Sequence, residues 1–352
     1  MSDMAVLQDY NIEQLNNLLG ELGEKPYRAK QIFQGLALGL KISEITNIGK
    51  DLRERLLENF VDCPVEIIET KVSAIDGTEK FLFKLSDGNI IEGVAMKYKY
   101  GITQCVSTQV GCRMGCAFCA SGIGGLVRNL TAGEILSEIY AVNRYLGGTR
   151  EKRAVTNIVL MGSGEPLDNY DNVVKFIKLL ADKDGLNVSP RNVSLSTCGI
   201  VPNIIRLSEE NIDVNLTVSL HNPFDDGRKT IMPIANKYKV SEILSACDVY
   251  FEKTGRRFIF EYSLCKGVND SKTHADELIR ILRGRPCHVN LIRLNAVKEK
   301  ALEGTSEKDA YKFSAMLEKG GLSVTVRRQM GADIDGACGQ LRRNYISGIK
   351  DD

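Results

Sequence analysis

Histidines, long apolar runs and an excess of charge of one sign are all scarce in this chain of 352 residues. The three histidines, His221, His274 and His288, form no HExxH motif and no paired Cys/His motif, so any metal site must rely on sulfur. No apolar run reaches the roughly 18–20 residues that span a bilayer, and the first residues lack the basic and apolar regions of a secretory signal. We therefore expect a cytoplasmic protein that does not enter a membrane.

The charges nearly cancel, because 46 lysines and arginines oppose 45 aspartates and glutamates. A net charge of +1 excludes strong overall attraction to a polyanion, so a nucleic acid would have to be held by local basic patches and by shape. Hydrophobic residues make up 43% of the chain, which is ordinary for a folded protein, and the length allows two or three domains.

Two short regions precede the main part of the chain. Residues 1–62 read as short helices, for which a plain accessory domain with a solvated charged face and an RNA-binding domain both remain open. Residues 63–97 contain three β-rich runs separated by Asp76-Gly77 and Asp87-Gly88, dipeptides that favour tight hairpin turns. This pattern predicts a small antiparallel meander that links the flanking domains.

Strands and helices alternate across residues 98–331. The patterning predicts strands at 104–109, 156–161, 192–196, 214–220, 258–264 and 288–293, and helices at 132–146, 170–183, 239–253, 273–283 and 307–319. This series of six βα units predicts an α/β fold with a parallel sheet, either an open doubly wound sheet or an incomplete barrel. A C-terminal segment, residues 332–352, follows.

Distinctive groups follow the predicted strands, at the ends where parallel βα folds carry their function. A cysteine-rich loop follows the first strand, residues 162–166 (GSGEP) follow the second, Ser196 ends the third and residues 219–221 (SLH) follow the fourth. We therefore expect one functional face, built from these strand ends.

Three of the ten cysteines, Cys112, Cys116 and Cys119, form a C-x3-C-x2-C motif in one glycine-rich loop. A structural zinc site normally takes four protein ligands, whereas this loop has three thiols and no nearby histidine. An iron–sulfur cluster with three cysteine-bound irons and one open iron fits these residues better than zinc or simple packing does. A small molecule could then chelate the open iron.

The spacing of these cysteines resembles the signature of the radical S-adenosylmethionine (AdoMet) superfamily, and further motifs narrow the resemblance. YRAKQIF, CVSTQVGC, RNLTAGEI, MGSGEP, LSTCGIVP, SLHNP, IMPIANKY, KGVND, HVNLIR and DIDGACGQLR occur in this order along nearly the whole chain. Together they are similar to the RlmN family, which methylates carbon 2 of adenosine in 23S rRNA and tRNA. The resemblance implies an incomplete (β/α)6 barrel, a 4Fe–4S cluster, and AdoMet that is cleaved to a 5′-deoxyadenosyl radical.

The same resemblance implies roles for three further residues. Cys338 would accept a methyl group from one AdoMet, and the radical from a second AdoMet would remove a hydrogen from that S-methyl group, which then adds to the adenine. Cys105 would attack the Cys338 sulfur, releasing methylated RNA and leaving a transient disulfide. Glu92 would be the proton acceptor for the adduct carbon. From the residues alone, buried packing for Cys105, an inert surface thiol for Cys338 and an outward-facing position for Glu92 remain open.

The resemblance also implies the residues that contact AdoMet and RNA. The AdoMet contacts are expected at Gly164, Glu165, Ser196, Ser219, Leu220, His221 and Asn295. The Glu165 carboxylate would meet the AdoMet ammonium, and His221 would be a contact and not an acid or base. Contacts to RNA phosphates are expected at Arg327, Arg328, Arg342 and Arg343, for which solvated charge is the alternative. The remaining cysteines are expected to pack, with Cys198 beside the cofactor loop: Cys63, Cys198, Cys247, Cys265 and Cys287.

The implied partners are 23S rRNA, tRNA as a further substrate, and an electron donor such as flavodoxin or ferredoxin; a monomer is expected. One alternative is a Cfr-type enzyme, which methylates carbon 8 of the same kind of adenosine and shares the catalytic cysteines, although Pro166 favours the carbon-2 group. A second alternative is a non-catalytic iron–sulfur protein that binds RNA. This alternative would give no shared role to Cys105, Cys338 and Glu92.

The chain departs from the family pattern at two places. Asn295 is followed by Ala296 where relatives often have proline, and GLALGL follows YRAKQIF where many have aromatic residues. These changes affect loop geometry and the packing of the N-terminal region, and they leave the cysteine motif intact.

Overall fold

The computed structural model of the chain describes residues 4–294 and 301–334. Within them the strands are β1 (Val65–Val72), β2 (Glu79–Leu85), β3 (Ile90–Tyr98), β4 (Gly101–Cys105), β5 (Gln109–Gly111), β6 (Leu126–Asn129), β7 (Val155–Leu160), β8 (Val193–Thr197), β9 (Asn215–Ser219), β10 (Phe258–Leu264), β11 (Cys287–Arg293) and β12 (Val324–Val326). The α-helices are α1 (Ile12–Glu21), α2 (Tyr27–Ala37), α3 (Lys50–Leu57), α4 (Ala132–Tyr145), α5 (Tyr170–Leu180), α6 (Val201–Leu207), α7 (Asp225–Ile231), α8 (Val240–Thr254), α9 (Lys272–Leu282) and α10 (Glu307–Lys319).

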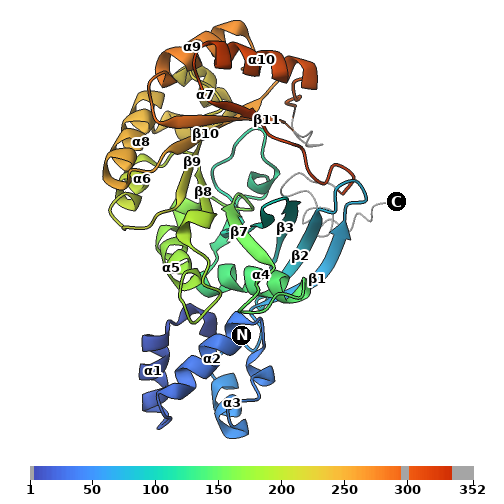
Figure 1. Cartoon of the computed structure of the whole chain (residues 1–352), viewed down its shortest axis with the longest axis vertical. Helices are drawn as coiled ribbons and strands as arrows, with labels where there is room; N and C mark the ends of the chain where they lie inside the picture. Colours follow the sequence, from blue (N-terminus) through green and yellow to red (C-terminus); the bar gives the residue numbers. More distant parts are fainter. Residues whose placement is uncertain (1–3, 295–300, 335–352) are drawn as a thin grey trace.

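A ten-stranded sheet runs through the molecule in the order β1-β2-β3-β4-β7-β8-β9-β10-β11-β12. The pairs from β1 to β4 are antiparallel, and the pairs from β4 to β12 are parallel. The parallel strands stand in chain order, without the reversal that marks a doubly wound sheet. Of the two architectures that the sequence leaves open, the incomplete barrel is therefore the observed one, with α5, α6, α8, α9 and α10 outside the strands (Figure 1).

The predicted strands match the observed ones closely, except for the first. The run predicted at 104–109 contains the end of β4 and the first residue of β5, and is not one strand. β4 begins earlier than predicted, at the tight turn that joins it to β3. Gly101 in this turn has φ of +130°, and a Cβ there would lie 2.2 Å from Thr156 Oγ1, so the turn requires glycine. Two further strands, β6 and β12, were not predicted, because four and three residues are too few to show a pattern.

The meander β1–β3 continues the barrel sheet and does not stand apart from it. Lys80 on β2 lies opposite Val94 on β3, and Val94 lies opposite Cys105 on β4. Opposed residues share one face of a sheet, and residues two apart on a strand also do. The side chain of Glu92 therefore lies on the same face as those of Lys80 and Cys105.

The helices α1–α3 lie together at one end of the molecule (Figure 1). Asn11 begins α1 with a capping box, in which its side chain accepts a hydrogen bond from Gln14 N at 2.8 Å and the Gln14 side chain accepts one from Asn11 N at 3.0 Å. Asp9 attaches this region to the barrel, because its carboxylate accepts a hydrogen bond from Gly133 N, at the start of α4, at 2.8 Å.

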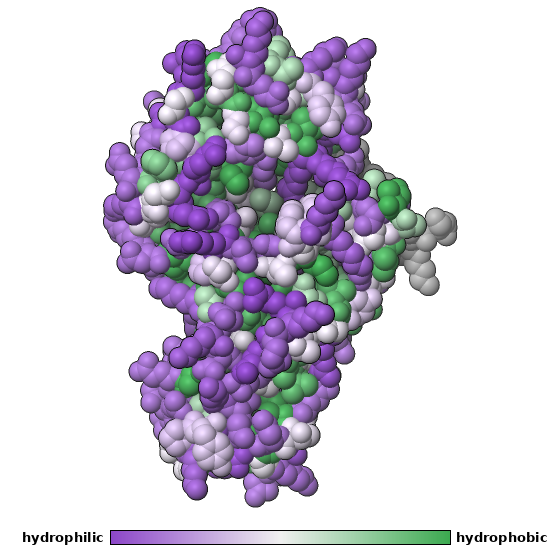
Figure 2. Space-filling view, viewed as in Figure 1, coloured by the Kyte–Doolittle hydropathy of each residue, from purple (hydrophilic) through white to green (hydrophobic). Residues whose placement is uncertain are grey.

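The apolar side chains form a main core that extends from the N-terminal helices through the barrel. Hydrophilic residues cover most of the face shown in Figure 2, with apolar residues between them. In the described part of the chain, no helix has the length and apolar character needed to cross a bilayer.

Candidate active site

Hydrogen bonds fix the loop that carries the cysteine motif. Cys112 N donates to Gly125 O at 2.9 Å, and Ala117 N donates to the carbonyl of Ile231, the last residue of α7, at 2.9 Å. Gly111 has φ of +79°, and a Cβ there would lie 2.0 Å from the carbonyl oxygen of Gly125, so only glycine fits. The protein's own contacts therefore hold the backbone around the three cysteines.

Cys112, Cys116 and Cys119 line a cavity of about 260 Å³, which we call the cysteine-loop cavity. Burial raises the pKa of Cys112 and of Cys116 to about 12, and the neighbouring thiols add to the rise. These groups therefore need a bound cation to become thiolates. Among the described residues, no three Cys, His, Asp or Glu side chains converge on a single ion position. Three close but separate thiols fit an iron–sulfur cluster, in which each cysteine binds a different iron.

The ends of the parallel strands supply the other walls of the cysteine-loop cavity. Five of the seven residues expected to contact AdoMet line it: Gly164, Glu165, Ser196, Ser219 and His221. Leu220 is buried behind them, and its backbone N donates to Glu261 O at 3.0 Å. Asn295 lies outside the described residues.

Glu165 presents a buried carboxylate that backbone N–H groups hold in place. Cys198 N donates to Glu165 Oε2 at 2.7 Å, and Leu167 N donates to Oε1 at 3.0 Å. Burial raises the pKa of Glu165, and these hydrogen bonds partly oppose the rise. A ligand ammonium in the cavity would favour the ionised carboxylate, so the site suits a cationic group.

His221 serves as a fixed neutral contact. Its φ is +56°, its Nδ1 accepts a hydrogen bond from Ser263 N at 2.9 Å, and its ring centroid lies 4.7 Å from that of Phe118. Burial lowers the pKa of His221 to about 3, with a contribution from Arg228. The imidazole is therefore uncharged near neutral pH and does not act as a proton shuttle there.

Arg228, which the sequence analysis missed, ties two strand ends together behind the cavity. This wholly buried side chain donates from Nη2 to Cys198 O at 2.6 Å and from Nε to Leu220 O at 3.1 Å. Cys198 itself lines the cavity and packs beside Cys116. The charged segment FDDGRKTI gives no sign that its arginine is buried.

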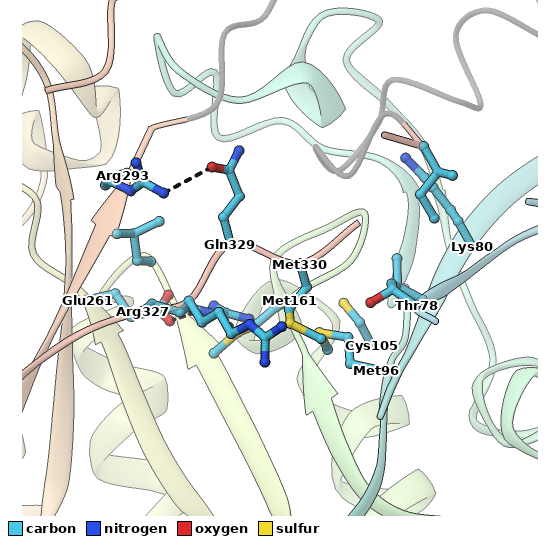
Figure 3. A pocket seen from close by; sticks show the side chains of 14 residues that line it. Thr78, Lys80, Met96, Cys105, Met161, Glu261, Arg293, Arg327, Gln329 and Met330 are labelled. Carbon is cyan, nitrogen blue, oxygen red and sulfur yellow. Dashed lines mark hydrogen bonds and ion pairs between the residues drawn. The ribbon is translucent and has the colours of Figure 1, made fainter. Parts of the chain in front are cut away.

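A second cavity of about 260 Å³ lies between the meander, the barrel and the segment after β12; we call it the meander cavity (Figure 3). Cys105, which is 6% exposed, and Lys80 line this cavity. Glu92 is 3% exposed, so the alternative that it faces outward into solvent is wrong. Its Oε2 lies 3.6 Å from Lys80 Nζ. The structure thus gathers two of the predicted catalytic residues, and adds Lys80 to them.

The two cavities share part of their walls, and Glu261 stands at the junction. Both are lined by Met161, Glu261, Ile292 and Arg293. Ser196 Oγ, from the first cavity, donates to Glu261 Oε2 at 3.4 Å, and Arg327 Nη1, from the second, lies 3.5 Å from Glu261 Oε1. Neither Glu261 nor Lys80 was predicted. A charge inside the apolar run FIFEYSL was a usable signal for Glu261, whereas Lys80 stands at the edge of TEKFLFKL, whose inner charge, Lys84, is exposed.

The chain after β12 docks on the turn between β1 and β2. Ser73 Oγ donates to Asp333 Oδ1 at 2.6 Å, Ala74 N donates to Asp333 Oδ2 at 2.8 Å, and Gly331 N donates to Asp76 Oδ2 at 2.9 Å. Ile334 follows and lines the meander cavity.

The four arginines expected to contact RNA are only partly described. Arg327 faces Glu261, whereas Arg328 is exposed at the rim of the meander cavity. Cys338, Arg342 and Arg343 lie outside the described residues.

Comparisons with known proteins agree along the whole chain. The radical SAM superfamily model matches residues 106–279, and a model of the ribosomal RNA large subunit methyltransferase N-terminal domain matches residues 6–61. A probable dual-specificity RNA methyltransferase RlmN from Clostridium novyi (strain NT) is 50% identical, covering 97% of this chain and 99% of that protein. One from Clostridium perfringens (strain SM101 / Type A) is 52% identical, with 97% and 98% covered.

A solved structure is also similar. The crystal structure of a radical SAM methyltransferase from Sphaerobacter thermophilus matches with a TM-score of 0.90 and 41% identity, covering 95% of this chain and 98% of that one.

Proposed function

The chain belongs to the RlmN family of radical SAM RNA methyltransferases, and from this premise we propose that it methylates carbon 2 of an adenosine in 23S rRNA and of an adenosine in tRNA. The observation that carries the proposal is the pair of adjoining cavities. One is lined by the three-cysteine loop and the strand ends, and the other is lined by Cys105 and by Lys80, which pairs with Glu92. Such a pair provides separate places for the cofactor and for the target base.

In this proposal the cysteine-loop cavity is the cofactor site. Cys112, Cys116 and Cys119 hold a 4Fe–4S cluster, which when bound supplies the electron that cleaves AdoMet. The Glu165 carboxylate binds the AdoMet ammonium, and the hydroxyls of Ser196 and Ser219 bind its polar groups. The contact set is completed by Gly164, Leu220, His221 and Asn295.

The meander cavity is the proposed place of methyl transfer. Cys338 follows Ile334 by four residues, which span at most about 14 Å, so its thiol can reach the cavity that Ile334 and Cys105 both line. The Cys338 thiolate accepts a methyl group, and the activated methyl carbon bonds to the adenine. Glu92 takes the proton from the adduct carbon, and the Cys105 thiolate then attacks the Cys338 sulfur to release the RNA.

The remaining assignments concern RNA, reductant and domain organisation. We assign RNA phosphate contacts to Arg328, Arg342 and Arg343, and to Arg327 once RNA competes with Glu261 for its guanidinium. The electron donor is a flavodoxin or ferredoxin, and the protein acts as a monomer. The domains are residues 1–62 (accessory, RNA-binding), 63–97 (meander), 98–331 (radical SAM core) and 332–352 (C-terminal segment).

Product analysis tests the proposal. The full chain is reconstituted anaerobically with iron and sulfide, incubated with AdoMet, a chemical reductant and unmodified 23S rRNA or tRNA, and the digested nucleosides are analysed by mass spectrometry. We expect 2-methyladenosine from both RNAs, and none from Cys338→Ala. Predominant 8-methyladenosine would contradict the choice of carbon, and AdoMet cleavage without any methylated adenosine would contradict the RNA substrate.

A further inference from the structure

Lys80 is a wholly buried lysine in the wall of the meander cavity. Its ammonium group lies 3.6 Å from Glu92 Oε2, and that carboxylate is itself buried. Figure 3 shows Lys80 rising from β2 at the opposite side of the cavity from Arg293 and Glu261. A buried ammonium is strongly unfavourable unless a carboxylate compensates it, so the two charges depend on each other.

The register of the sheet explains why the pair forms. Lys80, Val94 and Cys105 lie side by side on three adjacent strands, and Glu92 is two residues before Val94 on the same face. Lys71 on β1 lies directly opposite Lys80 in the register of the sheet.

Packing alone does not require this lysine. Leu82, on the same face of β2, packs against Ile90, so this face also accepts buried apolar side chains. In other proteins, replacing both members of a buried ion pair by apolar residues often costs no stability. What a methionine at position 80 could not do is pair with the buried Glu92 carboxylate and fix its position. The position of the pair, beside Cys105, makes that property useful.

We infer that Lys80 is a positioning residue of the methyl transfer: its ammonium group pairs with the Glu92 carboxylate and holds it in place beside the meander cavity. The inference rests on the proposed function. In the step concerned, the C–H bond of the adduct carbon breaks, its electron pair stays on the adenine, and an O–H bond forms on Glu92. The proton raises the charge of the pair from zero to +1, which Lys80 carries until Glu92 releases the proton to solvent.

The test compares three variants of the full, reconstituted protein with the wild type. Lys80→Met removes the charge at similar length, and Lys80→Arg keeps it. Lys84→Met is the matched control, because Lys84 is an exposed residue on the same face of the same strand. Each variant receives AdoMet, reductant and unmodified 23S rRNA, and three quantities are measured: 5′-deoxyadenosine formed in the first turnover, covalent protein–RNA adduct on denaturing gels, and methylated adenosine released.

For Lys80→Met we expect release of methylated adenosine to slow about tenfold or more at pH 7, with adduct accumulating and first-turnover 5′-deoxyadenosine unchanged. Lys80→Arg should recover most of the wild-type rate at pH 7, and Lys84→Met should match the wild type.

Three results would overturn the inference: loss of 5′-deoxyadenosine formation in Lys80→Met, release that slows without adduct, or a loss that Lys80→Arg does not restore. Each would mean that Lys80 serves the structure only. The wild-type product separately tests the proposed function, because 8-methyladenosine would contradict the carbon assignment. The role of Lys80 would still be tested in that case, by the ratio of adduct to released product in the variants.

Discussion

The cysteine-loop cavity and the meander cavity have the same volume, about 260 Å³, yet the fold builds them in different ways. The first takes its side chains from the carboxyl ends of parallel strands, and backbone N–H groups stabilise its carboxylate, Glu165. The second takes most of its side chains from the antiparallel strands β2–β4 and from the chain after β12, and a lysine in its wall pairs with the buried carboxylate of Glu92 beside it. Fixed backbone dipoles suit a cofactor bound in one orientation, whereas a side-chain cation suits a carboxylate that must gain and lose a proton.

The largest effect should come from the cysteine loop, which lines the cysteine-loop cavity. Cys116→Ala should lower 5′-deoxyadenosine formation and RNA methylation by on the order of 10³-fold or more, because the cluster loses one of three protein ligands. Iron content and the visible absorbance of the reconstituted protein report the loss directly. Chelation of iron from the wild type should have the same effect.

Cys63→Ala provides the control, since this thiol lies outside both cavities and is only partly buried. It should retain iron and activity. Full iron content in Cys116→Ala would contradict the assignment of the loop.

The next largest effect should come from Glu165, the buried carboxylate of the cysteine-loop cavity. Glu165→Gln should weaken AdoMet binding about 10- to 100-fold, because an amide cannot pair with the ammonium group. Burial raises the pKa of Glu165, so in the wild type AdoMet binding should weaken as the pH falls through that raised pKa, and this dependence should vanish in the variant. Anaerobic equilibrium dialysis measures both effects; an unchanged dissociation constant would place the ammonium elsewhere.

A smaller effect should come from the contacts that hold the C-terminal segment at the meander cavity. Asp333→Asn weakens the hydrogen bonds from Ser73 and Ala74, so the disulfide between Cys105 and Cys338 should form about three- to tenfold more slowly. Mass spectrometry of alkylated peptides after one turnover gives this rate. Asp276→Asn, on the exposed side of α9, should behave like the wild type, and equal rates in both variants would show that the contacts do not position Cys338.

The same contacts predict a response to acid. Burial opposes ionisation of Asp76, but hydrogen bonds from Gly331 N and from Thr78 lower its pKa to about 2. A depressed pKa stabilises the folded protein above the ordinary value of 3.8, and this stabilisation is lost as the pH falls toward 2. The contact should therefore hold throughout the neutral range, and in Asp76→Asn the loss of stability between pH 4 and 2 should be smaller than in the wild type by chemical denaturation.

The smallest effect should come from His221. Its positive φ is one that asparagine tolerates, and its pKa of about 3 leaves the ring neutral, so His221→Asn should change the methylation rate by no more than about threefold. The pH–rate profile between 6 and 8 should keep its shape. An inflection near pH 6.5 in the wild type that disappears in the variant would contradict this role.

The difference between the two cavities also explains which parts of the molecule could be predicted from the sequence. The comparisons confirm the family resemblance and the fold class, which followed from ordered motifs and from six βα units. The cysteine-loop cavity was predictable too, because parallel strand ends meet at one edge and the motifs mark those ends. Gly164, Glu165, Ser196, Ser219 and His221 accordingly line one cavity.

The meander cavity was much less predictable, because its residues come together through strand register and through a segment distant in the sequence. Lys80 meets Glu92 and Cys105 only because β2, β3 and β4 pair in one particular register. Glu261 and Arg228 were missed for a related reason, since their partners are Arg327 and the carbonyls of Cys198 and Leu220. No local pattern encodes such pairings.

The measurement that tests the division between the two cavities most directly follows the methyl carbon. The reconstituted protein is first incubated with AdoMet that carries a ¹³C methyl group, then freed of small molecules, and given unlabelled AdoMet, reductant and a limiting amount of 23S rRNA. If Cys338 at the meander cavity carries the methyl group, the methylated adenosine of the first turnover will contain ¹³C. Unlabelled methyl in that first product would show that the methyl group passes directly from the cofactor in the cysteine-loop cavity, and would contradict the account.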